Sequence, residues 1–202
     1  MSLLDHTLYA ALWLVFGAIH SVLARDRIKQ RLHRYFGRAY RAAYNIFAAV
    51  HFALTIIIAK VLLAPGSAVF IATPGIAWLL TALMVTGIII AIAALLHYDL
   101  GLFAGTTQLR KPPAGPTADD DGPLHITGLH RYVRHPLYTG IILFLIGAIR
   151  TEFDAATAVW AILYILIGTH FEERSLITRY GAAYETYRQQ VPAFFPWRGR
   201  IG

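Results

Sequence analysis

The sequence contains no cysteine and is poor in charged residues. The lack of cysteine excludes disulfide bonds, thiolate metal sites and a cysteine nucleophile. Only 14% of the residues are charged, whereas soluble domains usually carry about 25%. The charge is also unbalanced, with 18 Lys and Arg against 11 Asp and Glu. Because the basic residues lie beside long apolar runs, they indicate a membrane surface as partner and no nucleic acid.

Long apolar runs account for the low share of charged residues. A hydrocarbon core of about 30 Å requires about 20 helical residues, because each residue rises about 1.5 Å. The runs are 7–23, 42–63, 74–96, a shorter one within 132–149 that we expect to be a helix partly in the interface, and 155–169 after a polar turn. The sequence therefore predicts an all-α, polytopic membrane protein with about five transmembrane helices, the last two forming a helical hairpin.

We expect a single membrane domain over residues 1–202 with four consecutive parts. They are an N-terminal three-helix part (1–96), a cytosolic loop with a polar motif (97–135), the helical hairpin (136–170), and a cytosolic amphipathic C-terminal helix with its tail (171–202). Prolines and the run Asp119-Asp120-Asp121 predict that the second part is a loop. No internal repeat is evident, which argues against a secondary transporter.

Lysine and arginine lie almost entirely in the connections on one side. The basic segments are 25–41, 110–134 and 174–200, whereas the other side has only Lys60 and Arg150. Short basic loops stay in the cytosol, so we expect a multi-pass inner or plasma membrane protein with its N-terminus outside and its C-terminus cytosolic. No cleavable signal is expected, because residues 1–5 lack a basic region.

The densest polar cluster is at residues 127–140. Arg134 and His135 precede Pro136, where a helix is expected to begin. Tyr138 and Gly140 follow within that helix, and a glycine lets a ligand or a neighbouring helix approach the backbone. The cluster is either a basic interfacial anchor or part of a binding site.

A second polar cluster ends the last apolar run. Placing the carboxylates of Glu172 and Glu173 in lipid would cost much free energy, so at least one should face protein or a polar cavity. The hairpin returns the chain to the side of Arg134 and His135, which predicts either an ion pair that locks the hairpin or a carboxylate that binds a ligand. Beyond it, Tyr180, Tyr184 and Tyr187 share one helical face, a spacing typical of packing as well as of ligand binding.

Isolated polar residues give weaker candidates. His20, His97 and Asp99 lie at cytosolic helix ends, where they are candidates for the substrate side of a pocket or are simply interfacial. His51 lies inside an apolar run and is a functional candidate or a histidine bonded to a neighbouring helix. The histidines lack metal-ligand spacing, so no metal site is expected.

The two clusters together resemble the isoprenylcysteine carboxyl methyltransferase and phospholipid methyltransferase superfamily. The matching motifs are GLHRYVRHPLYTG at 128–140, EERSL at 172–176 and YGAAY at 180–184, continuing through Tyr187 to Val191 and Pro192. IHSVLAR at 19–25 and HYDL at 97–100 are more similar to the methanethiol S-methyltransferase and NnrU-type branch. Gln190 departs from the pattern, since carboxyl methyltransferases of this group often have a basic residue there.

The resemblance implies a membrane methyltransferase that binds S-adenosylmethionine from the cytosol. It assigns the cofactor pocket to Gly128, His135, Pro136, Tyr138, Gly140, Tyr184, Tyr187 and Glu172 or Glu173. It implies catalytic roles for Arg134, His135 and Glu173, and we expect neither a metal nor a covalent intermediate. His135 or His97 is a candidate base.

The acceptor of the methyl group is left open by these motifs. We expect a small or lipid-like thiol or carboxylate, such as methanethiol or an isoprenylcysteine. Two alternatives remain: a non-catalytic NnrU-type membrane protein, and a nicotinamide-dependent reductase on a related fold. The reductase is disfavoured because about ten spans are expected there.

Overall fold

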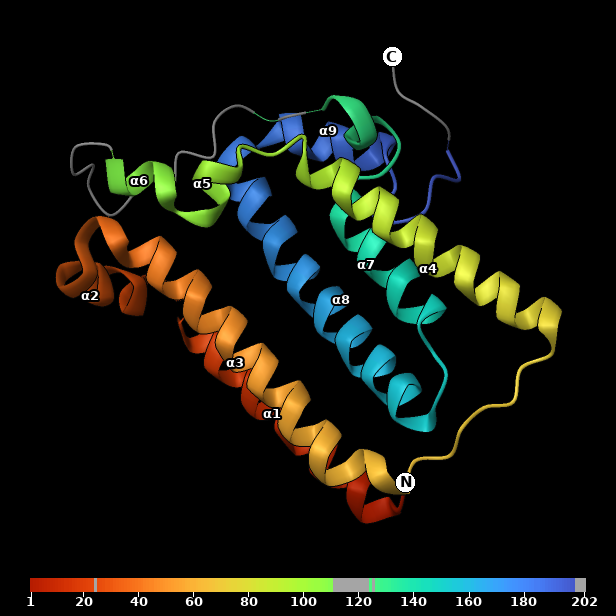
Figure 1. The fold of residues 1–202 in the computed structure, drawn as a ribbon. Coiled ribbons are helices and arrows are strands. Elements are labelled where there is room, and N and C mark those ends of the chain that lie inside the picture. Colours follow the sequence, from red (N-terminus) through yellow and green to blue (C-terminus); the bar gives the residue numbers. More distant parts are fainter. Residues whose placement is uncertain (24, 111–123, 125, 199–202) are drawn as a thin grey trace. The chain divides into compact units, whose positions relative to one another are not determined.

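Helices form the regular structure of the described residues, which are 1–23, 25–110, 124 and 126–198 of the computed structural model (Figure 1). In this part of the chain, extended pairing is limited to one isolated bridge between Val69 and Thr151. The chain divides into two compact units. The first comprises Met1–Ser67 and Tyr98–Gly122, and the second comprises Ala68–His97 and Pro123–Gly202.

The first unit is built on two long helices that pack against each other. Its elements are α1 (Leu3–Leu23), α2 (Asp26–Phe36), η1 (Gly37–Ala39), α3 (Tyr40–Leu63), η2 (Ala64–Gly66), α5 (Leu100–Ala104) and α6 (Thr106–Arg110). Aromatic rings fill the α1–α3 contact: Trp13 meets Phe16 and Phe52 edge-on, at centroid distances of 5.7 and 6.2 Å. These rings bury the face that α1 turns toward α3.

The second unit contains the motifs identified from the sequence. Its elements are α4 (Pro74–Leu95), η3 (Gly128–Arg131), α7 (Pro136–Gly147), α8 (Glu152–Tyr180) and α9 (Ala182–Gln190). The side-chain oxygen of Thr73 accepts a hydrogen bond from the Ile76 amide at the start of α4, where Pro74 follows as a first helical residue that needs no N–H partner.

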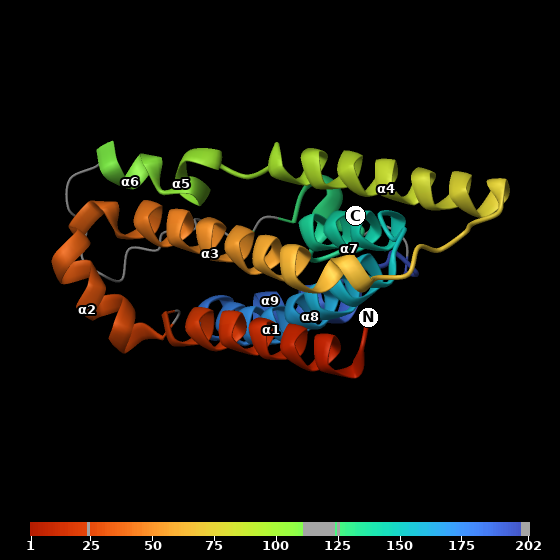
Figure 2. The ribbon, with the colours of Figure 1, turned by 60° about the horizontal axis from the view of Figure 1, so that its bottom comes forward.

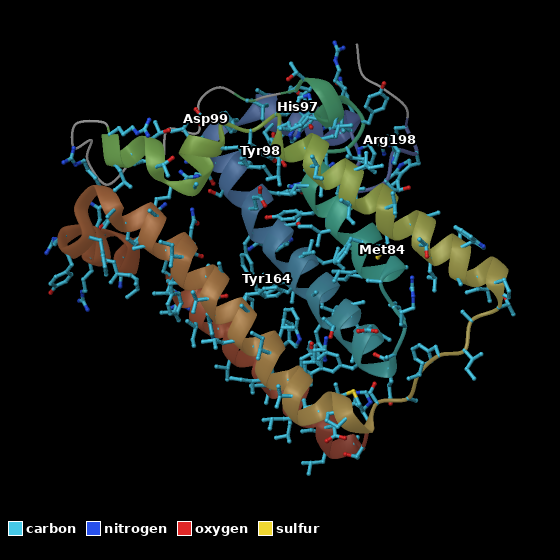
Figure 3. All side chains as sticks on the ribbon, viewed as in Figure 1. Met84, His97, Tyr98, Asp99, Tyr164 and Arg198 are labelled. Carbon is cyan, nitrogen blue, oxygen red and sulfur yellow. The ribbon has the colours of Figure 1, made fainter. Side chains whose placement is uncertain are left out.

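Helix α7 lies along α4 in both ribbon views (Figures 1 and 2). Glycines make this close approach possible: a Cβ on Gly140 would lie 2.6 Å from the Ala91 nitrogen, and one on Gly87 would lie 2.6 Å from the Gly140 oxygen. Gly147 lies in the same way against the backbone of Met84, which is labelled on α4 in Figure 3. The two backbones therefore pack with no side chain between them.

The hairpin between α7 and α8 has a polar tip. Thr151 and Asp154 cap α8 reciprocally, because the Asp154 amide donates to Thr151 Oγ1 and the Thr151 amide donates to Asp154 Oδ2. Arg150 caps the other helix: its Nη1 donates to the Gly147 and Ile149 oxygens at 2.8 Å each, and its Nη2 lies 3.5 Å from Thr81 Oγ1 on α4. A guanidinium thus satisfies the carbonyl of the last residue of α7 and that of Ile149 just beyond the helix.

The membrane prediction is confirmed, and the span count only in part. Among the described residues, four helical stretches are long and apolar enough to cross a membrane: Leu3–Leu23, Arg27–Gly66, Pro74–Leu95 and Glu152–Tyr180. The chain is therefore an integral membrane protein. The helix expected over 132–149 is shorter, Pro136–Gly147, because residues before Pro136 form η3 or hydrogen-bond to the C-terminal segment. At about 1.5 Å per residue it is about 18 Å long, too short for a full span.

Two further expectations need correction. The expected loop at 97–135 contains α5, α6 and η3, because the Asp99 carboxylate caps α5 at the Leu102 amide, 2.9 Å away. Asp119, Asp120 and Asp121 lie outside the described residues. The single amphipathic helix expected over 171–190 is divided, since α8 runs to Tyr180 and Gly181 takes a positive φ of 56° before α9.

Candidate functional site

Arg134 and Glu173 form the centre of the site. Arg134 Nε and Nη2 donate to the same oxygen, Glu173 Oε1, at 2.8 and 2.5 Å. Both side chains are largely buried, with 10% and 13% of their surface exposed. Arg134 comes just before α7 and Glu173 lies in α8, so the ion pair joins the two arms of the hairpin, as one of the two sequence interpretations expected.

His135 binds the same carboxylate oxygen. Its Nε2 lies 3.1 Å from Glu173 Oε1, and its Nδ1 lies 4.0 Å from Glu172 Oε1. His135 is buried, whereas 43% of the Glu172 side chain is exposed. Tyr138, one helical turn further, stacks on the imidazole at a centroid distance of 5.7 Å and an interplanar angle of 22°. The two glutamates thus take different places, one inside the cluster and one at its rim.

The contacts described for the Glu173 carboxylate use only one of its oxygens. Arg134 and His135 both reach Oε1, and no hydrogen bond of Oε2 occurs within the described residues. A carboxylate can accept about four hydrogen bonds. Glu173 is therefore oriented by its two neighbours and retains acceptor capacity toward a further group.

The segment after α9 is tied to the start of α7. The Arg134 and His135 amides donate to the Pro192 and Ala193 oxygens at 2.9 and 3.0 Å. Arg134 Nη1 donates to the Val191 oxygen and, at 3.1 Å, to the Arg188 oxygen. Every guanidinium nitrogen of Arg134 consequently has a partner, so the side chain is held in one orientation.

Two residues next to these contacts were missed by the sequence analysis. Thr139 Oγ1 lies 2.8 Å from the Phe194 oxygen, and the Phe194 ring lies 5.9 Å from the His135 ring. Both help to hold residues 192–194 beside the histidine. The sequence carried no signal for these contacts, because their acceptors are backbone carbonyls, which every residue has.

Tyr184 and Tyr187 are buried against each other and against Val191. The Tyr187 hydroxyl donates to the His130 oxygen at 2.6 Å. The Tyr184 hydroxyl is buried and has no hydrogen-bond partner among the described residues. Burial, with a smaller effect of the neighbouring Glu173 carboxylate, raises the pKa of Tyr184 to about 12, and the nearby Arg134 guanidinium acts in the opposite direction. This hydroxyl is therefore a protonated donor at neutral pH.

The remaining motif residues have packing contacts in the second unit. Gly128 has a φ of 57°, and a Cβ there would lie 2.6 Å from Nε2 of His97. His97 lies just beyond α4 (Figure 3), with its Nδ1 2.7 Å from the Ala93 oxygen. Pro136 is buried as the first residue of α7, and Gly140 faces α4. The structure thus brings His97 to the polar motif.

His20 and Asp99 belong to the first unit. The His20 ring stacks on His51 at a centroid distance of 5.6 Å and an interplanar angle of 10°, with Phe16 packed on both. Asp99 caps α5. Each of these residues is thus engaged locally, and their role toward a substrate stays a prediction.

The fold and this cluster define a helical integral membrane protein with a charged site at one end of a hairpin. The model of the NnrU family, described as NnrU protein, matches residues 8–149. This is more than half of the sequence, so the chain belongs to the NnrU family.

Curated relatives extend the similarity. Methanethiol S-methyltransferase 1 of Bradyrhizobium diazoefficiens is 29% identical over 93% of this chain and 65% of its own length. Methanethiol S-methyltransferase of Pseudomonas sp. is 30% identical over 95% of this chain and 73% of its own length. The chain thus spans about two thirds of these relatives.

A more distant relative matches a shorter stretch of the chain. Protein-S-isoprenylcysteine O-methyltransferase of Schizosaccharomyces pombe is 36% identical over 34% of this chain and 31% of its own length. These relatives agree with the superfamily and the branch indicated by the motifs. No solved structure matches the chain.

Proposed function

We propose that this protein is an S-adenosylmethionine-dependent methyltransferase of the membrane, with its active site on the cytosolic side. The observation that carries the proposal is the Glu173 carboxylate, fixed by Arg134 and His135 through one oxygen while the other has acceptor capacity. The names of its relatives support the methyltransferase class.

The residues present fit such a ligand. The ligand carries an ammonium, a sulfonium and ribose hydroxyls, and the cluster offers the Glu173 carboxylate, the rim carboxylate of Glu172 and the aromatic face of Tyr138. Aromatic faces attract cations. The buried Tyr184 hydroxyl, which lacks a described partner, is a further polar group for the ligand to satisfy. When bound, S-adenosylmethionine supplies an electrophilic methyl group.

Each side chain then has a distinct task. Arg134 positions Glu173 and the C-terminal segment, and Glu173 binds the hydroxyl or ammonium groups of the ligand. His135 directs Nε2–H at Glu173, which leaves Nδ1 as the basic nitrogen able to take a proton from a thiol acceptor. His97 is the second candidate base. Catalysis rests mainly on alignment of donor and acceptor, with neither a metal nor a covalent enzyme intermediate.

The proposed acceptor is a small or lipid-like thiol or carboxylate, such as methanethiol or an isoprenylcysteine. A thiol is favoured over a carboxylate by Gln190, which replaces the basic residue expected to orient a carboxylate. It is also favoured by the names of the two relatives that match over most of this chain.

Calorimetric titration of the purified chain with S-adenosylhomocysteine tests the proposal. We expect binding by the wild type and binding weakened at least about tenfold by Glu173→Gln, since a charged hydrogen bond contributes about 1.5–3 kcal/mol. Glu185→Gln, an exposed glutamate of α9, is the matched control and should bind like the wild type. No binding by folded wild-type protein would refute the proposal, and stabilisation by NADPH alone would favour the reductase.

A further inference from the structure

Helix α2 (Asp26–Phe36) has one strongly basic face. Arg27, Arg31 and Arg34 stand at positions i, i+4 and i+7, which lie on the same side of an α-helix, and all three are exposed. Over residues 24–45 the sequence has seven basic residues and a single acidic one. Like charges at this spacing destabilise a helix, so an anionic partner would stabilise α2.

The adjacent face of α2 is apolar. Ile28, Leu32 and Phe36 stand at i, i+4 and i+8, with the first two half-buried and Phe36 50% exposed. Tyr35 beside them is 81% exposed. A helix with arginines on one face and aliphatic and aromatic side chains on the other is typical of the membrane interface.

The position of α2 between two apolar helices determines its depth in the membrane. It begins directly after the connection from α1, which ends at Leu23, and the three residues of η1 separate it from α3. Gly37, with a φ of 52°, lets the chain turn out of α2 into η1. Because both α1 and α3 are apolar enough to cross a membrane, such short connections keep α2 at the level of the lipid headgroups.

From this charge, amphipathicity and depth, we infer that α2 is a binding surface for anionic phospholipid headgroups. Arg27, Arg31 and Arg34 bind the phosphates, whose oxygens match the planar guanidinium fork. Ile28, Leu32 and Phe36 enter the edge of the acyl region. This surface belongs to the first unit and does not depend on the methyltransferase proposal. A lipid is favoured over a nucleic acid because α2 lies at headgroup depth next to two apolar helices.

The test measures amide hydrogen exchange of the full chain in lipid nanodiscs. One sample contains phosphatidylcholine alone, and the other an equimolar mixture with phosphatidylglycerol of the same acyl chains. We expect exchange over Asp26–Phe36 to slow about tenfold or more in the anionic discs, because each arginine near an anionic surface contributes about fivefold. Added salt should remove the difference, whereas α9 should exchange equally in both discs.

Two triple variants assign the effect to charge. R27Q/R31Q/R34Q should lose the slowing by phosphatidylglycerol, and R27K/R31K/R34K should keep most of it. Equal exchange of the wild type in both lipids would overturn the inference, as would a glutamine variant that still responds. Slowing by an oligonucleotide in phosphatidylcholine discs, without any by phosphatidylglycerol, would also overturn it.

Discussion

Arg134 and Glu173 are 39 positions apart in the chain, yet two nitrogens of the guanidinium meet one oxygen of the carboxylate at 2.8 and 2.5 Å. The third nitrogen of the same guanidinium donates to the Arg188 carbonyl in the last turn of α9 and to the Val191 carbonyl just after it. One side chain therefore connects the start of α7, the C-terminal part of α8 and the C-terminal segment.

Replacing Arg134 with lysine should destabilise the protein by about 2–4 kcal/mol. An ammonium has its donors on one nitrogen and lacks the planar fork that spans the carboxylate and the two carbonyls, and a largely buried carboxylate that loses its partner is costly. Denaturant unfolding in detergent measures the effect. In a double-mutant cycle with Glu173→Gln we expect a coupling of about 1–3 kcal/mol, and strictly additive effects would contradict the coupling.

Variants of the two buried tyrosines of α9 should distinguish a role in protein stability from a role in ligand binding. Tyr187→Phe removes the hydrogen bond to the His130 oxygen and should cost about 1 kcal/mol of stability. Tyr184→Phe removes a hydroxyl without a described partner, so stability should be unchanged or slightly higher. S-adenosylhomocysteine binding should instead weaken, as calorimetry can show. Unchanged affinity in Tyr184→Phe would exclude that hydroxyl from the ligand site.

A pair of glycine variants tests the contact of α7 with α4. Gly140→Ala would place a Cβ 2.6 Å from the Ala91 nitrogen, against backbone that cannot yield easily, so we expect a loss of about 1–3 kcal/mol. Gly168→Ala on α8 meets nothing within 4 Å and should be neutral or stabilising by up to about 1 kcal/mol. Thermal unfolding in detergent compares them. Equal effects would mean that the close packing contributes little.

The lack of cysteine allows the proposed orientation to be tested with single introduced thiols. Ala68→Cys reports on the connection between α3 and α4, and Gln189→Cys on the end of α9; both residues are exposed. In intact cells, a membrane-impermeant maleimide should label the first and not the second, whereas permeabilised cells should show both. The reverse pattern would place the site outside the cytosol.

The sequence predicted the membrane helices well because run length and hydropathy are local properties. It also predicted that Arg134 and His135 meet the glutamates, because a hairpin returns the chain to the same side. It did not predict features that depend on hydrogen bonds between segments far apart in the chain. Helix α7 starts only at Pro136, since the preceding amides donate to the Pro192 and Ala193 oxygens. The break at Gly181 was missed because the tyrosine spacing also fits one continuous helix.

The C-terminal end of α7 does not reach the N-terminal end of α4. Arg150, at the tip of the hairpin, meets Thr81, which lies about two turns inside α4 from Pro74. The hairpin tip therefore lies about 10 Å along α4 from the first residue of that helix. Residues 68–70 cover the tip at this point, because the Phe70 amide donates to the Arg150 oxygen and the Glu152 amide to the Ala68 oxygen, at 2.8 and 2.9 Å. The segment that precedes α4 thus closes the end that the short helix α7 leaves open.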